Sequence, residues 1–153
     1  GSEMCIRDSY YGRGPFENYI DRYSSSFIGR YEDKVENQFY WYIRPQETGN
    51  KTDVRWLTLL DSGGLGVKIT GLQPISFSAL HFSPEDLDPG LTRKLQHTID
   101  IVPQKNIFLH VDLKQRGLGG DNSWGMYPHN EYRLLDKKYT YSYMIELAEK
   151  GSD

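Results

Sequence analysis

Several short stretches of the chain alternate apolar and polar residues with a period of two. VRWLTLL (residues 54–60), ISFSALHF (residues 75–82) and NIFLHVDLKQ (residues 106–115) show this alternation, and residues 67–72 form a further short run between turn signals. A period of two places the apolar side chains on one face of a half-buried strand. The pattern therefore predicts strands at these four places.

Other segments carry weaker strand signals. NQFYWYIR (residues 37–44) is dense in aromatic residues, which favour pleated sheet, and a further strand is expected around residues 97–101. Residues 131–135 and 139–147 read as two closing strands around the Asp-Lys-Lys turn at residues 136–138.

Three segments predict structure other than strand. Residues 10–22 contain glycine and proline and no clear period, which indicates an ordered loop, and residues 23–36 are mixed, with room for one helical turn. Ser83, followed by Pro84 and by Asp86 three residues later, predicts the N-terminus of a short helix.

Together these elements predict an all-β domain of the sandwich type. Strand follows strand with almost no helix between, so the sheets should be mainly antiparallel. Aromatic residues make up 14% of the 153 residues, with 12 tyrosines, and this supports β-structure.

Charge and composition exclude several classes of function. The net charge is −3 with both signs interspersed and no basic run, so we expect no nucleic-acid partner. No apolar run approaches the length of a membrane span, so no membrane partner is expected, and the compartment is left open. The single cysteine, Cys5, cannot form an internal disulfide or a cysteine-based zinc site.

The first nine residues stand apart from the rest. GSEMCIRDS (residues 1–9) resembles the translation of a sequencing adapter. We therefore expect a non-native tail, which is neither a signal peptide nor the start of a strand, followed by one partial domain at residues 10–150.

Single polar residues do not identify a catalytic site. The candidate carboxylates are expected to be solvated turn groups or partners of arginines, and they are Glu17, Asp21, Glu47, Asp53, Asp61, Asp112 and Asp121. His110 and Asp112 share one face of a predicted strand, where a structural hydrogen bond is the simpler interpretation. The four histidines lack metal-ligand spacing, so no metal site is predicted.

The loop GLGGDNSWG (residues 117–125) is the strongest functional signal. Its glycines Gly117, Gly119 and Gly120 permit backbone conformations closed to other residues, but a bare linker would not need Trp124. Two roles fit the pattern: the indole is a rigid wall for a sugar ring, or it plugs the open end of the sandwich. Asp121 and Asn122 could bind sugar hydroxyls or brace the loop through Asx turns.

Three separated motifs carry a resemblance to a known family. GRGPFENYIDR (residues 12–22), YIRPQETGNKTDVRW (residues 42–56) and HVDLKQRGLGGDNSWG (residues 110–125) occur in this order, followed by HNEYRL (residues 129–134). Together they resemble the C-terminal domain of the bacterial β-galactosidases of glycoside hydrolase family 2, the small-chain or domain 5 type. The resemblance extends from residue 10 to about residue 147 and implies an antiparallel β-supersandwich similar to galactose mutarotases.

The resemblance also implies a division of labour. In the family the catalytic glutamates belong to an upstream TIM barrel, so this piece would contain no catalytic residue and would be inactive alone. Its partners would be a β-galactoside and the missing barrel and sandwich domains, in a parent enzyme that forms homo-oligomers and binds Mg²⁺ and a monovalent cation elsewhere. The family's loop tryptophan stacks on the sugar at the aglycone side, and here it corresponds to Trp124, with Asp121 and Asn122 as weaker candidates.

Two other functions stay open at this point. The chain could be a stand-alone carbohydrate-binding or interaction module that uses Trp124 as its platform. A mutarotase-like epimerase ranks last, because it would need its own acid and base in one pocket, and half a supersandwich is a poor candidate for that.

Overall fold

One long strand organises the fold. In the computed structural model, which describes residues 5–88, 90–92, 96–122 and 124–151, β4 (Leu65–Leu80) pairs with three other strands. The remaining strands are β1 (Arg7–Gly14), β2 (Phe27–Lys34), β3 (Lys51–Leu60), β5 (Phe108–Asp112) and β6 (Tyr143–Glu149). The short helices are α1 (Pro84–Leu87) and the 3-10 turns η2 (Val35–Gln38), η3 (Gly90–Thr92), η4 (Thr98–Asp100) and η5 (Asn130–Tyr132).

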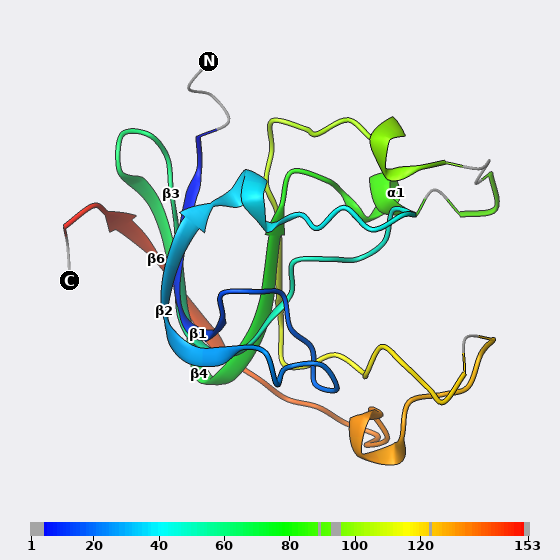
Figure 1. Ribbon diagram of the computed structural model, residues 1–153. Coiled ribbons are helices and arrows are strands. Elements are labelled where there is room, and N and C mark those ends of the chain that lie inside the picture. Colours follow the sequence, from blue (N-terminus) through cyan, green and yellow to red (C-terminus); the bar gives the residue numbers. More distant parts are fainter. Residues whose placement is uncertain (1–4, 89, 93–95, 123, 152–153) are drawn as a thin grey trace.

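All strand pairs within the described residues are antiparallel, in the order β2-β1-β3-β4-β5. β3 takes one edge of β4, and the other edge is shared, since β6 pairs with its first half and β5 with its second. The sheet curls strongly, as Figure 1 shows. The prediction of a mainly antiparallel all-β fold is confirmed.

The core lies within the curl of the sheet. It contains Tyr10, Val35, Val54, Leu57, Ile69, Ile75, Phe77 and Ala79, all almost fully buried. Tyr10 packs edge-on against Phe77, with ring centroids 5.3 Å apart. A second cluster forms around α1 and contains Phe39, Leu80, Phe82, Leu87 and Ile101.

Two local predictions are confirmed in detail. The predicted strand at residues 54–60 lies within β3. Ser83 caps α1 through a capping box, because its Oγ accepts a hydrogen bond from Asp86 N (3.1 Å) and its own N–H donates to Asp86 Oδ2 (2.8 Å).

Near the N-terminus the expected loop at residues 10–22 is wrong for its first five residues, whereas residues 15–22 lie outside the named helices and strands. Residues 10–14 belong to β1, which starts at Arg7, so the expectation that no strand begins within residues 1–9 is also wrong. Residues 27–34 form β2 rather than a helical turn. These strands escaped detection because β1 is rich in tyrosine and glycine, and β2 is an edge strand with both faces largely polar or exposed.

Further along the chain, local composition predicted two strands where there is one and predicted strands where the chain is irregular or helical. The predicted strands at residues 67–72 and 75–82 are one strand, β4, which tolerates Pro74 because a register shift against β3 leaves residues 71–74 outside that ladder. Residues 37–38 belong to η2 and residues 39–44 are irregular, since Phe39 turns inward and packs against Phe82 with ring centroids 4.5 Å apart. The strand expected at residues 97–101 is wrong, since these residues contain η4. Of the two closing strands that were expected, the first is replaced by η5 and a loop, and the second corresponds to β6.

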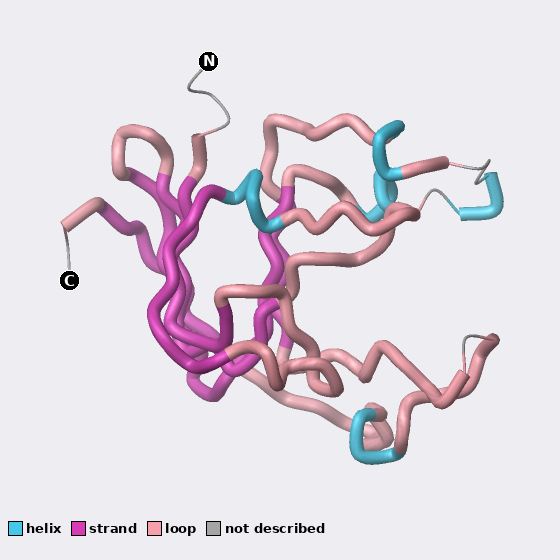
Figure 2. The backbone as a smooth tube through the Cα atoms, viewed as in Figure 1, coloured by secondary structure: helices cyan, strands magenta, loops and turns pink. Residues whose placement is uncertain are grey.

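Long connections leave the sheet on the side that carries the candidate site. Residues 113–142 join β5 to β6 and contain mostly loop with the short turn η5, as Figure 2 shows. This segment, which we call the arm, includes the whole glycine-rich motif.

Candidate functional site: the tryptophan loop and the neighbouring cleft

The base of the arm is anchored at Gly117. Its N–H donates to the carbonyl of Tyr132 (2.7 Å), which ties the two sides of the arm together. A Cβ at this position would lie 2.6 Å from Asp21 Oδ2 and 2.8 Å from the Cβ of Tyr132. Only glycine therefore allows the arm to approach the body of the domain this closely.

Asp21 connects two of the sequence motifs. Its Oδ2 accepts a hydrogen bond from the backbone N–H of Gly119 (3.1 Å), across 98 positions of sequence. The sequence predicted Asp21 only as a solvated turn group or a partner of an arginine and did not link it to the glycine loop. No local signal could reveal this link, because it depends on where the arm leaves β5.

The outer part of the arm folds back on itself. A Cβ at Gly120 would clash with the carbonyl oxygen of Met126 and lie 2.7 Å from the Met126 Cβ. Three residues further on, His129 Nε2 and Asp121 Oδ1 are 2.8 Å apart, and this hydrogen bond raises the pKa of His129. Residues 121–129 thus form a closed loop, which we call the tryptophan loop.

Trp124 lies at the exposed end of the tryptophan loop. Its backbone N–H donates to Asn122 Oδ1 (3.0 Å), an Asx-type contact that sets the turn, while Gly125 adopts φ +114°. Ser123 lies outside the described residues. Trp124 is 87% exposed, so its indole ring does not pack inside the described part of this chain.

A polar network beside the base of the arm surrounds Glu17, which was expected to be a solvated turn group or a partner of an arginine. The Glu17 carboxylate accepts hydrogen bonds from Tyr19 Oη (3.1 Å), Thr48 Oγ1 (2.9 Å) and Gly49 N (2.8 Å). Tyr42 Oη donates to its other oxygen. The network holds the first two sequence motifs together and positions the segment that carries Asp21.

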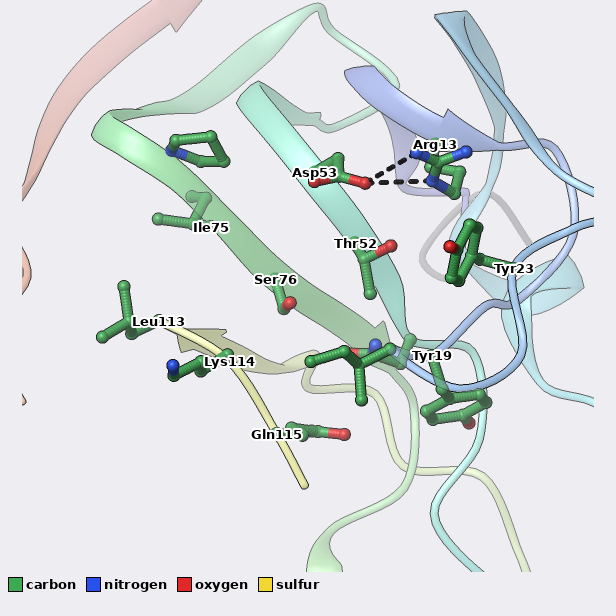
Figure 3. Close-up of a pocket in the computed structure, with 13 residues that line it drawn as sticks. Arg13, Tyr19, Tyr23, Thr52, Asp53, Ile75, Ser76, Leu113, Lys114 and Gln115 are labelled. Carbon is green, nitrogen blue, oxygen red and sulfur yellow. Dashed lines mark hydrogen bonds and ion pairs between the residues drawn. The ribbon is translucent and has the colours of Figure 1, made fainter. Parts of the chain in front are cut away.

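A cleft of about 270 Å³ adjoins the base of the arm (Figure 3). Asp53 on β3, Ser76 on β4 and Lys114 just after β5 line it together with residues of the first motif. Arg13 lies at the cleft and is paired with Asp53, with Nη2 2.9 Å and Nε 3.0 Å from Asp53 Oδ2. Trp124 is not among the lining residues.

Sequence reasoning did not find this cleft. Asp53 was expected to be a solvated turn group or the partner of an arginine, and it pairs with Arg13; their common cavity arises from the pairing of β1 with β3 and of β3 with β4. His110 and Asp112, considered as a pair, lie outside the cleft lining, and Asp112 accepts instead a hydrogen bond from Gln115 Nε2 (3.4 Å).

Within the described ranges, no three His, Cys, Asp or Glu side chains gather where they could hold a metal ion. Across the same ranges, none of the helices has the length and apolar character needed to cross a bilayer.

Comparison with known proteins connects this geometry to a family. Residues 4–145 match the family described as "Beta galactosidase small chain". The chain is 37% identical over 139 residues to a β-galactosidase of Priestia megaterium and 36% identical over 140 residues to one of Streptococcus thermophilus. A β-galactosidase of Vibrio cholerae is 33% identical over 144 residues.

These alignments cover 90%, 90% and 94% of this chain respectively, but the chain spans only 13% of the length of each of these relatives. The family match covers the strands β1 to β5, the cleft and the tryptophan loop. The chain therefore belongs to the β-galactosidase small-chain family.

Proposed function

We propose that this chain is the part of a β-galactosidase that presents an aromatic platform, Trp124, to the sugar. The single observation that carries the proposal is an indole ring that is 87% exposed on a braced loop, in a chain whose relatives are named β-galactosidases. The flat apolar face of an exposed tryptophan suits the C–H face of a sugar, and its indole N–H is left to form a hydrogen bond.

The bracing of the loop gives the platform its rigidity. Asp21 holds Gly119, Asn122 holds the Trp124 backbone, and Asp121 pairs with His129. Because these three acidic or amide groups already have partners in the loop, their main role is to orient the ring. Direct contacts of Asp121 and Asn122 with sugar hydroxyls would be secondary.

The chemistry itself would come from the remainder of the parent enzyme. Hydrolysis of a terminal β-D-galactoside with retention, as in glycoside hydrolase family 2, needs a carboxylic acid and a carboxylate nucleophile on the two sides of one glycosidic bond. We assign both groups, the Mg²⁺ and monovalent cation sites and the contacts of a homo-oligomer to parts of the enzyme beyond these 153 residues. No step is assigned to either ion in this chain.

A chimera tests the proposal. The corresponding segment of the Priestia megaterium relative would be replaced by residues 10–148 of this chain, and KM and kcat would be measured with a chromogenic galactoside. Aromatic stacking worth about 1–3 kcal/mol corresponds to a loss of about 5- to 150-fold in kcat/KM for Trp124→Ala. Trp124→Phe should retain part of the stacking and lose less.

Trp41→Phe is the matched control, because Trp41 is also exposed but lies outside the tryptophan loop and the cleft. Equal kcat/KM values for Trp124→Ala and the unsubstituted chimera would contradict the platform role of Trp124. Galactoside turnover by the purified 153-residue chain, above that of a heat-treated sample, would contradict the assignment of the catalytic carboxylates to the rest of the enzyme.

A further inference from the structure

We propose that the cleft in Figure 3 is a binding site for a neutral, polyhydroxylated ligand of the size of one sugar ring, separate from the platform at Trp124. Its volume of about 270 Å³ lies just below the range of about 300–1,000 Å³ typical of pockets for drug-sized molecules. A cavity of this size suits a single ring rather than an oligosaccharide.

The hydrogen-bonding groups of the cleft suit hydroxyl groups. Thr52 and Ser76 contribute hydroxyls, and Asp53 and Gln115 contribute a carboxylate and an amide. Hydroxyl and amide groups can donate and accept, and the carboxylate accepts, which matches the mixed donors and acceptors of a sugar's hydroxyls. Figure 3 shows that they come from both strands β3 and β4 and from the segment after β5.

The backbone at Asp53 supports a binding role. Asp53 adopts φ +53°, a conformation that costs energy for a residue other than glycine, and it lies where the β3–β4 register shifts. Opposite, Gly12 packs so closely that a Cβ would lie 2.8 Å from the Cα of Val54. Bulges and strained residues cluster at sites where a side chain must be directed to one place, and this bulge places Asp53 beside Arg13 at the cleft.

Asn50 is a second, independent observation. It is 1% exposed and lines the cleft; its Nδ2 donates to the carbonyl of Asn18 (2.9 Å), while its Oδ1 has no partner in the part of the chain that the structure describes. A buried amide oxygen without a partner is costly, and native proteins rarely leave one unexplained. The Oδ1 atom has less than 1 Å² of accessible surface, so a ligand hydroxyl would reach it only after a small local shift of the cleft wall.

One wall of the cleft is suited to the apolar face of a sugar. Tyr23 forms this wall beside Arg13, whose Cζ is 4.8 Å from the ring centroid, and Leu113 lies on the opposite side of the cleft (Figure 3). A sugar ring has C–H groups on its faces and hydroxyls around its edge. It can therefore pack on this wall while its edge reaches Thr52 and Ser76.

The charges of the cleft favour a neutral ligand over an anion. The guanidinium of Arg13 is already paired with Asp53, and the ammonium of Lys114 lies 5.1 Å from the ring centroid of Tyr139. A phosphate or carboxylate would have to approach the Asp53 carboxylate, while Lys114 keeps its charge but directs it toward the Tyr139 ring.

The test is a two-dimensional NMR titration of the ¹⁵N-labelled 153-residue chain with methyl β-D-galactopyranoside and, separately, with inorganic phosphate. The sugar should shift the amide signals of Thr52, Asp53, Ser76 and Gln115 with a millimolar Kd, the affinity that so small a ligand supports. Phosphate should leave them unchanged. Sugar concentrations up to about 100 mM without shifts at these residues, or larger shifts with phosphate, would overturn the proposal.

Two variants separate binding from folding. Tyr23→Ala and Gln115→Ala change partly exposed side chains and should each weaken the sugar at least about fivefold, a modest change for lost contacts of this kind. Tyr127→Ala is the matched control, because Tyr127 is an exposed tyrosine under Arg133 at 4.9 Å, outside the cleft, and should leave Kd unchanged. Equal Kd values for all three variants would contradict the assignment.

The titration also distinguishes this site from the tryptophan platform. Shifts confined to residues 117–129 would overturn the cleft proposal and leave the platform standing. Cleft shifts that persist in Trp124→Ala support a separate site, whatever the kinetics of the chimera show.

Discussion

The Glu17 network allows a quantitative test of how the first motif stabilises the domain. Replacing Glu17 by Gln keeps the shape of the side chain and removes its charge. Three donors converge on Oε2, from Tyr19, Thr48 and Gly49, and the side chain is only 9% exposed. The amide oxygen of glutamine can replace Oε2, so these three hydrogen bonds survive as neutral ones.

The expected loss follows from that exchange. Hydrogen bonds to a charged acceptor contribute about 1.5–3 kcal/mol each, against about 0.5–1.5 kcal/mol for neutral pairs, so three exchanges cost about 3 kcal/mol. The lower cost of burying an amide instead of a carboxylate offsets part of this. Arg22, 3.8 Å from Oε1, adds little because its side chain is 61% exposed. We expect Glu17→Gln to lower the free energy of unfolding by about 2 kcal/mol, and Glu17→Ala by more, since it leaves all the donors unpaired.

Guanidinium chloride unfolding, followed by circular dichroism, measures the loss in the free energy of unfolding. In thermal unfolding, a domain of this size should lose about 4–8 °C in Tm for Glu17→Gln. Glu47→Gln is the control, because Glu47 is exposed and accepts a hydrogen bond from Gln115 at the surface. Should Glu17→Gln match Glu47→Gln in stability, the reasoning about the buried carboxylate is refuted.

Three further predictions concern pH and the arm. Burial raises the pKa of Asp8 to about 6, so the folded chain binds this proton more tightly than the unfolded chain. The stabilisation from this group is therefore fully present below about pH 4. About 2–3 kcal/mol of the free energy of unfolding is lost as the pH rises to about 6. Unfolding at both pH values should show this loss in the native chain and not in Asp8→Asn; equal pH dependence in the two would contradict it. The hydrogen bond to Asp121 raises the pKa of His129, so the contact is strongest with a protonated imidazole below about pH 6.5 and weakens as the pH rises through the pKa of His129 in the folded chain. NMR titration of the imidazole should give a lower pKa in Asp121→Asn. An unchanged pKa would show that the contact is absent in solution. Gly120→Ala should speed hydrogen exchange of the tryptophan loop, because its Cβ would clash with Met126 across the loop. Gly119→Ala should not, because there is open space around a Cβ at that position. Identical exchange in the two variants would show that the close approach is absent.

Elements that depend on local physical chemistry were predictable. The period-two pattern of residues 54–60 reports one buried face, and the Ser83 capping box is complete within four residues. The elements that were missed have local preferences that long-range packing overrides. Phe39 is in an aromatic run with strand propensity, yet its ring is used to close the second core cluster on Phe82.

By itself, the sequence determined the antiparallel all-β class, the helix cap, the family and the presence of a tryptophan on a glycine-rich loop, because each of these is encoded in neighbouring residues or in ordered motifs. Only the tertiary structure decided that Asp21 holds Gly119, that the indole ring is exposed, and that Asp53 and Asn50 share a cleft. These features join residues up to 98 positions apart, and they depend on strand register, a bulge and the close approach of glycine backbone, which no local pattern of side chains specifies.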